Sequence, residues 1–136
     1  MSNLQNKSEI LIDAAKLLHD KNWYPAVAHG AYYCCYQLSK HIWLHKMGKS
    51  QQDLDRLCNA SKSGSHEVLI NEVRNYIRES NKANCDSHMR DYNSQILQLK
   101  KLRVKADYYD EVFDSSESNN AILLSDKIIT ILKKYQ

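Results

Sequence analysis

The sequence predicts an all-α protein, an antiparallel up-and-down bundle of four long helices plus one or two short helices. Apolar residues recur at the three- and four-residue spacing of a helix, and no stretch of any length alternates with the two-residue period of a strand. The chain also holds only three Gly and one Pro, too few for the frequent turns of a sandwich or barrel. Short polar connectors favour antiparallel neighbours in such a bundle.

Length and composition set the remaining limits. A chain of 136 residues fits one domain, residues 1–136, and a hydrophobic content of 43% can supply a core. The net charge of +3 permits an anionic ligand without demonstrating one. The chain has no apolar run long enough to span a membrane and no apolar signal core near Met1. We therefore expect a cytoplasmic protein that does not associate with membranes.

The four cysteines, Cys34, Cys35, Cys58 and Cys85, form no C-x-x-C pair. We expect four free thiols in a reducing compartment, because this pattern is neither a disulfide framework nor a zinc site. Cys34 and Cys35 are neighbours in a predicted helix, so their side chains are expected to point in different directions. The sequence suggests no metal and no cofactor.

The first two predicted helices cover residues 8–19 and 25–47. The first is expected to bury one apolar face, made by Ile10, Ala14, Leu17 and Leu18 with Leu11 beside them. Pro25 fits the first turn of the second helix, and Gly48 ends it. The expected buried face of the second helix is Ala28, Ala31, Cys35, Leu38 and Ile42. Gly30 costs this helix about 1 kcal/mol relative to Ala, which a close helix crossing would explain.

The second half of the chain predicts three further helices after a short one at residues 51–58. A loop at 59–64 precedes a helix that opens with Ser65 as a capping residue. A turn at 80–84 leads to the longest helix, at residues 86–109. After a loop at 112–119, Asp114 or Ser116 can cap the last helix, which ends near Lys133 and Lys134.

Arg103 interrupts an apolar stripe of the longest helix. The stripe follows alternating steps of four and three residues through Tyr92, Ile96, Leu99, Arg103 and Ala106. A guanidinium keeps its proton and is costly to bury unpaired, so a carboxylate, a partner subunit or a phosphate is expected beside it. Asp107 lies one turn further on, and an Arg103–Asp107 pair alone would contribute about 0.2–0.5 kcal/mol. Lys100 can either contact a phosphate or belong to a solvated face.

Other candidate residues have both a structural and a functional interpretation. His66 follows Ser65 at a helix start, where free N–H groups attract anions, or it is simply exposed there. His41 and His45 are one turn apart and would need a third ligand to bind zinc. The aromatic run Tyr32–Tyr36 either stacks on bases or belongs to the core.

Three segments together resemble the HEPN domain family, in particular its small stand-alone, UPF0332-like branch. They are Ala31-Tyr32-Tyr33-Cys34, Gly64-Ser65-His66-Glu67-Val68-Leu69 and Leu102-Arg103-Val104-Lys105-Ala106-Asp107-Tyr108. Their order and spacing match across nearly the whole chain. The resemblance implies a helical domain that forms a two-fold homodimer. It also implies a place in a prokaryotic toxin–antitoxin or defence system, often beside a minimal nucleotidyltransferase.

The same resemblance implies a ribonuclease signature that this chain lacks. Many relatives are metal-independent ribonucleases with an Arg followed, after four to six residues, by His. Here Tyr108 stands after Arg103 and four residues, and no His follows in the chain. A Tyr of pKa about 10 is ionised in roughly one part per thousand at neutral pH, a shortfall of roughly 4 kcal/mol for a general base. Gly30 also stands where relatives often carry an Arg.

The preferred expectation is a binding module for an RNA or nucleotide phosphate in a cleft around Arg103. Its expected binding residues are Arg103, Lys100, Ser65 and His66, with Asp107 orienting the arginine. One alternative is an endoribonuclease toxin that uses Arg103 with His66 or Tyr108. Another is a non-catalytic helical partner of a nucleotidyltransferase. The sequence leaves open whether the protein is an enzyme.

Overall fold

The computed structural model describes residues 1–136 and contains no β-strand, which confirms the all-α class. The α-helices are α1 (Asn3–Asp20), α2 (Val27–His41), α3 (Gln51–Ser61), α4 (Ser65–Arg78), α5 (Cys85–Tyr108) and α6 (Ser115–Leu132). A 3₁₀ turn, η1 (Tyr24–Ala26), leads into α2, and a π turn, η2 (Ile42–Lys46), continues it. The HEPN-like arrangement of the helices stays a prediction.

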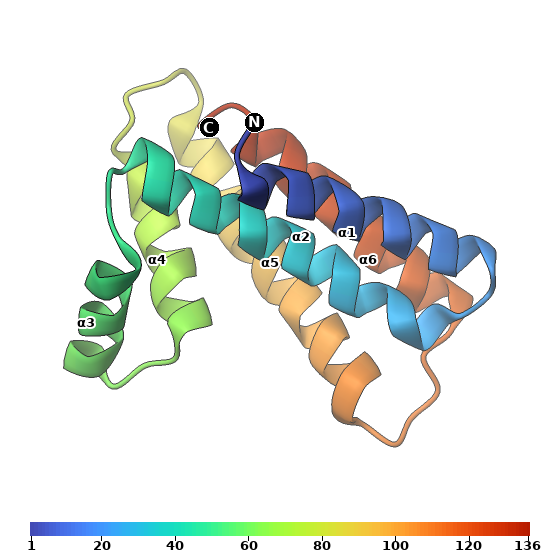
Figure 1. Cartoon of the computed structure of the whole chain (residues 1–136). Helices are drawn as coiled ribbons and strands as arrows, with labels where there is room; N and C mark the ends of the chain where they lie inside the picture. Colours follow the sequence, from blue (N-terminus) through green and yellow to red (C-terminus); the bar gives the residue numbers. More distant parts are fainter.

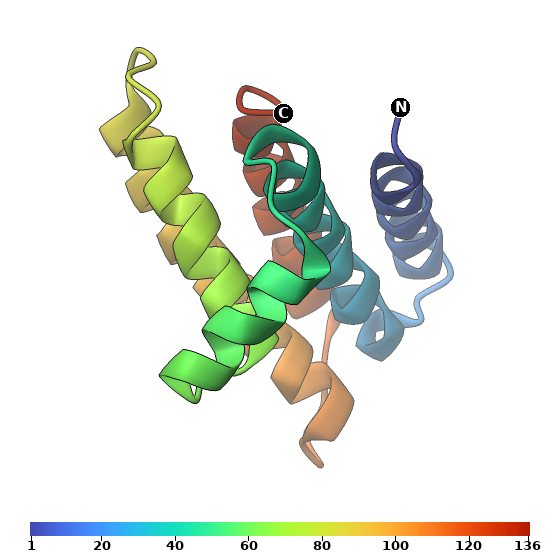
Figure 2. The same cartoon turned by 60° about the vertical axis from the view of Figure 1, so that its left-hand side comes forward.

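Helix α2 lies at the centre of the bundle and packs against α1, α4, α5 and α6 (Figure 1). Helix α3 lies at the outer edge beside α4, on the opposite side of the molecule from α1 (Figure 2). The two chain termini lie close together, and the Gln5 side chain donates a hydrogen bond to that of Gln136 at 3.2 Å. No helix combines the length and apolar character needed to cross a bilayer.

Helix α1 begins five residues before the predicted start, because Ser2 forms a capping box with Gln5. Its predicted apolar face is wrong in part, because Leu11 and Leu18 are half-buried against the core but Ile10, Ala14 and Leu17 are exposed. Ile10 and Leu17 are 67% and 58% exposed, whereas the buried residues are Ser8, Ile12 and Ala15. The reason is the close approach of α2, since the Ser8 hydroxyl donates a hydrogen bond to the Cys34 carbonyl at 2.8 Å. Small residues allow this contact and leave the larger side chains outside.

Gly30 lies where α1 and α2 approach each other. A Cβ atom at this position would lie 3.0 Å from the Leu11 carbonyl oxygen and 3.6 Å from the Ala15 side chain. The close helix crossing predicted from Gly30 is thus confirmed. The predicted buried face of α2 is confirmed as well, because every one of its five residues is buried.

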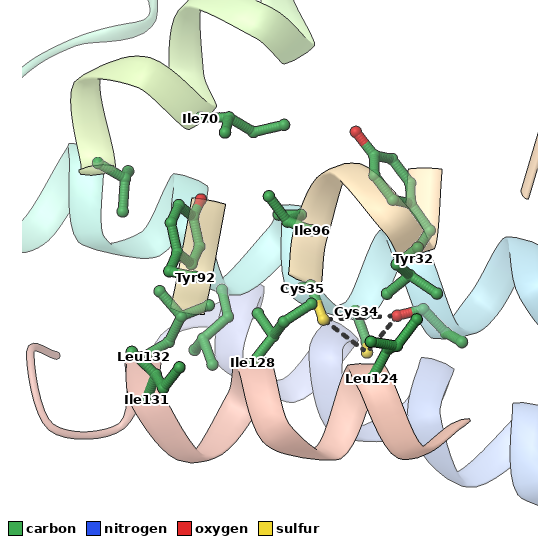
Figure 3. Packing of buried hydrophobic residues seen from close by; sticks show 14 of the residues in the cluster. Tyr32, Cys34, Cys35, Ile70, Tyr92, Ile96, Leu124, Ile128, Ile131 and Leu132 are labelled. Atoms are coloured by element: carbon green, nitrogen blue, oxygen red, sulfur yellow. Dashed lines mark hydrogen bonds between the residues drawn. The ribbon is translucent and has the colours of Figure 1, made fainter. Parts of the chain in front are cut away.

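The core is one cluster that all six helices build, and its centre holds two thiols (Figure 3). Cys34 and Cys35 were expected to point apart, but their sulfurs lie 3.9 Å from each other and both reach Ser125 of α6. The Ser125 hydroxyl itself donates to the Ala31 carbonyl at 2.8 Å, which holds it between the two sulfurs. All four cysteines are free, and burial raises the pKa of the Cys35 thiol.

The remaining helices confirm most predicted boundaries, with shifts at their ends. Helix α3 extends to Ser61, three residues beyond the predicted end. Helix α4 starts at Ser65 as predicted, but Gly64 occupies the capping position, so the capping role expected of Ser65 is wrong. Helix α6 starts at Ser115, inside the predicted loop, because Asp114 caps it and accepts a hydrogen bond from the Glu117 backbone at 2.9 Å.

Candidate anion-binding site around Arg103

Arg103 is a buried cation in the stripe that α5 turns toward the core. The buried residues of α5 are Tyr92, Ile96, Leu99 and Arg103, which confirms the predicted stripe except at Ala106, which is half-buried. The Arg103 side chain is only 10% exposed. Because the guanidinium remains charged, this position needs compensation from its neighbours.

Aromatic rings of α2 supply part of that compensation. The guanidinium carbon lies 5.1 Å from the ring centre of Tyr32 and 5.5 Å from that of Tyr33. The ring of Tyr108, the last residue of α5, lies 6.0 Å away and is 73% exposed. Contacts of this kind contribute about 0.5–2 kcal/mol, which is less than the cost of burying a charge.

Asp107 is the nearest anion but does not satisfy the guanidinium. Its Oδ2 lies 3.6 Å from Nη1 of Arg103, beyond hydrogen-bond distance, and 3.1 Å from Nδ1 of His29 on α2. The expected Arg103–Asp107 pair therefore exists, but the carboxylate is shared with a histidine. The Nε of Arg103 is buried and has no hydrogen-bond partner. The Asp107 carboxylate therefore balances part of the positive charge of Arg103, but the N–H groups of the guanidinium donate no hydrogen bond to it.

His66, at the start of α4, approaches Arg103 through Tyr32. The Tyr32 hydroxyl and Nδ1 of His66 lie 2.9 Å apart, and the His66 ring centre lies 4.3 Å from that of Tyr36. Burial lowers the pKa of His66, and the positive charges of Lys100 and Arg103 lower it further. The imidazole is therefore neutral at neutral pH. Burial also raises the pKa of Tyr32, so its hydroxyl keeps its proton.

The other expected site residues surround this group without touching the guanidinium. Lys100 lies one turn before Arg103 on α5 and is half-buried. Ser65 is exposed at the first position of α4. A groove of about 770 Å³ that Lys100 helps to line does not include Arg103 or His66. The neighbours of Arg103 include the half-buried Tyr33, and the exposed His29 packs against Tyr33.

Sequence reasoning missed His29 as a site residue. The available signal was its spacing, because His29, Tyr33 and Tyr36 recur at steps of four and three residues and share one face of α2. Their rings form a continuous series, with centres 4.6 Å apart for His29 and Tyr33 and 5.9 Å apart for Tyr33 and Tyr36. Of the run Tyr32–Tyr36, Tyr32 belongs to the core, whereas Tyr33 and Tyr36 are half-buried.

The histidine pair at the end of α2 has no metal site around it. The rings of His41 and His45 lie 5.0 Å apart, and His41 Nδ1 is engaged with the Ser2 hydroxyl at 2.8 Å. No group of three or more His, Cys, Asp or Glu side chains is placed to hold a metal ion.

No protein-family model, curated protein or solved structure matches this chain.

Proposed function

We propose that this protein binds the phosphate of an RNA or a nucleotide at Arg103. One observation carries this proposal: a side chain that cannot lose its charge is nine-tenths buried, and its Nε donor has no acceptor. A phosphate oxygen accepts hydrogen bonds from a guanidinium fork with good geometry, which the Asp107 carboxylate, 3.6 Å from Nη1, does not. An anion that enters beside Tyr33 would complete the environment of Arg103.

The aromatic face next to Arg103 favours a nucleotide over a simple anion. His29, Tyr33 and Tyr36 present a row of rings along α2, and His66 continues this row from α4. Base–aromatic stacking contributes about 1–3 kcal/mol per base and tolerates different bases. We propose that a base packs against these rings while its phosphate reaches Arg103, with Lys100 nearby to add attraction.

The resemblance to HEPN domains extends this proposal to the protein's context. We propose that the protein acts as a homodimer in a prokaryotic toxin–antitoxin or defence system, with two Arg103 sites facing each other. A neighbouring nucleotidyltransferase is the proposed partner. Light scattering tests the dimer, and a mass equal to one chain would refute it.

A binding series tests the proposed site. The probes are a fluorescein-labelled single-stranded RNA and a labelled nucleotide, measured by fluorescence polarisation at fixed salt. Arg103→Met removes the charge and keeps an unbranched side chain, and Arg90→Met is the matched control because Arg90 is an exposed arginine of the same helix. We expect Arg103→Met to weaken binding at least about tenfold and Arg90→Met to change it less than about twofold. Equal effects of the two substitutions would refute the proposed site.

A second candidate function, RNA cleavage, is favoured by the state of His66. A neutral imidazole can accept the proton of a ribose 2′-hydroxyl, while Arg103 stabilises charge on the phosphate under attack. Tyr108 is the other candidate for this role, and its ring also lies beside Arg103. Incubation of RNA with the wild type, Arg103→Met, His66→Asn and Tyr108→Phe, followed by gel analysis, tests cleavage. Intact RNA with the wild type refutes this candidate and leaves phosphate binding standing.

A further inference from the structure

The outer face of α5 carries a groove that shares only Lys100 with the proposed phosphate site. It has a volume of about 770 Å³ and lies along the second half of the helix, with Asn120 of α6 at one side. Its apolar lining residues are Leu97, Leu102, Val104 and Tyr109. Leu97 is 45% exposed, so part of a large aliphatic side chain of this groove is in contact with solvent. The groove therefore presents an apolar floor to solvent.

A second hollow continues this groove toward α4. It has a volume of about 340 Å³, lies between α4 and α5, and shares Leu97 and Lys100 with the first. Together the two hollows follow α5 from Asn93 to Tyr109. At 1.5 Å per residue this segment is about 24 Å long, the length of an α-helix of about 16 residues.

The rim of the groove is positively charged. Its lining includes Lys100, Lys101 and Lys105 and no carboxylate, and the second hollow adds Arg74 and one carboxylate, that of Glu67. Lys105 is neutralised within the chain, because its Nζ lies 2.6 Å from a Glu117 oxygen and 3.8 Å from a Glu111 oxygen. Lys100 and Lys101 take part in no ion pair of the protein. Their charges are available to a partner.

We infer that this groove binds an acidic amphipathic α-helix of a partner protein. Such a helix would place its apolar side chains on Leu97 and Val104 and its carboxylates beside Lys100 and Lys101. A second copy of this chain fits less well, because a two-fold contact would bring the same lysines of two subunits together. An RNA fits less well too, since the floor is mainly aliphatic and offers Tyr109 alone for stacking.

Two designed peptides probe this inference with the full chain. Each has about 16 residues, the length set by the helical rise, and leucines along one face. One carries glutamates on both flanks of that face, and the matched peptide carries lysines there. Fluorescence polarisation measures their binding to the wild type, to Leu97→Asp and to Lys101→Glu. Leu123→Asp is the control, because Leu123 is an exposed leucine of α6 outside the groove.

The wild type is expected to bind the glutamate peptide and not the lysine peptide. Leu97→Asp should weaken binding at least about tenfold, and Lys101→Glu about fivefold, while Leu123→Asp leaves it unchanged. Lys101→Glu should also gain affinity for the lysine peptide. Far-ultraviolet circular dichroism of each variant confirms that the helices remain folded.

Several outcomes would overturn the inference. They are absence of binding, equal binding of both peptides, or equal losses in Leu97→Asp and Leu123→Asp. Loss of RNA binding in Leu97→Asp would assign the groove to nucleic acid. A molecular mass of Leu97→Asp that is half that of the wild type in light scattering would assign the groove to a second copy of the chain. Neither Leu97 nor Lys101 belongs to the proposed phosphate site, so failure here leaves that proposal intact.

Discussion

The hydroxyl of Tyr32 lies 2.9 Å from Nδ1 of His66, while the ring of the same tyrosine packs 5.1 Å from the guanidinium carbon of Arg103. One core side chain of α2 therefore positions a neutral imidazole from α4 and a buried cation from α5. This arrangement places three segments far apart in the sequence at one site.

Tyr32→Phe separates the two contacts of this tyrosine. The substitution removes the hydrogen bond to His66 and keeps the ring beside Arg103. We expect the free energy of unfolding to fall by about 1 kcal/mol, the usual net contribution of one hydrogen bond. Urea unfolding of both proteins measures this loss, and RNA binding should stay within about twofold. A loss of binding as large as that of Arg103→Met would contradict the separate roles.

Arg103→Met should separate stability from binding. A methionine fills a similar volume without the cost of a buried charge, although it gives up the contacts with Tyr32 and Tyr33. We expect the free energy of unfolding to stay within about 1 kcal/mol of the wild type or to rise. Urea unfolding is the measurement. A loss of several kcal/mol would show that the arginine is retained for stability rather than for a ligand.

Gly30→Ala tests the close crossing of α1 and α2. Alanine favours a helix by about 1 kcal/mol over glycine, but here its Cβ would lie 3.0 Å from a backbone carbonyl that cannot turn away. We expect a net destabilisation of about 1–3 kcal/mol, seen as a lower melting temperature. Gly64→Ala is the control, because a Cβ at Gly64 meets open space. Equal effects at both positions would contradict the crossing.

The stability of the protein should depend on two histidines near neutral pH. Burial lowers the pKa of both His41 and His66 below the ordinary value of 6.5. As the pH falls below about 6.5, the two histidines become protonated in the unfolded chain but stay neutral in the folded chain. The free energy of unfolding therefore decreases until the pH is below the pKa values of the histidines in the folded state. Urea unfolding at pH 7.5 and 5.5 should show lower stability at pH 5.5. The double variant His41→Asn, His66→Asn should lose less on acidification, and an equal loss would exclude these histidines as the cause.

Much of the helical framework could be predicted because it depends on local signals. The capping residue Asp114, the helix end at Gly48 and the stripe of α5 were all readable from spacing and residue type. The exposure of Ile10 and Leu17 in α1 could not be predicted in this way, because these residues have the spacing of a buried stripe. Which stripe of α1 is buried depends on how closely α2 approaches, a tertiary property that no local pattern records.

The candidate site was predictable one residue at a time but not as an arrangement. Arg103 could be identified because it lies in an apolar stripe, and His66 could be identified because it lies at the start of a predicted helix. Their link through Tyr32 depends on the packing of α2 between α4 and α5. The contact between His29 and Asp107 depends on tertiary packing as well, because the two residues are 78 positions apart in the chain.

The most direct measurement follows the Nε–H resonance of Arg103 by ¹⁵N NMR while a nucleotide monophosphate or a short RNA is added. Arg56, Arg74, Arg78 and Arg90 provide the internal controls. We expect the Arg103 signal to move more than the others and to slow its exchange with water, because its unpaired Nε–H gains an acceptor. An unchanged Arg103 signal at saturating ligand would contradict phosphate binding at this side chain.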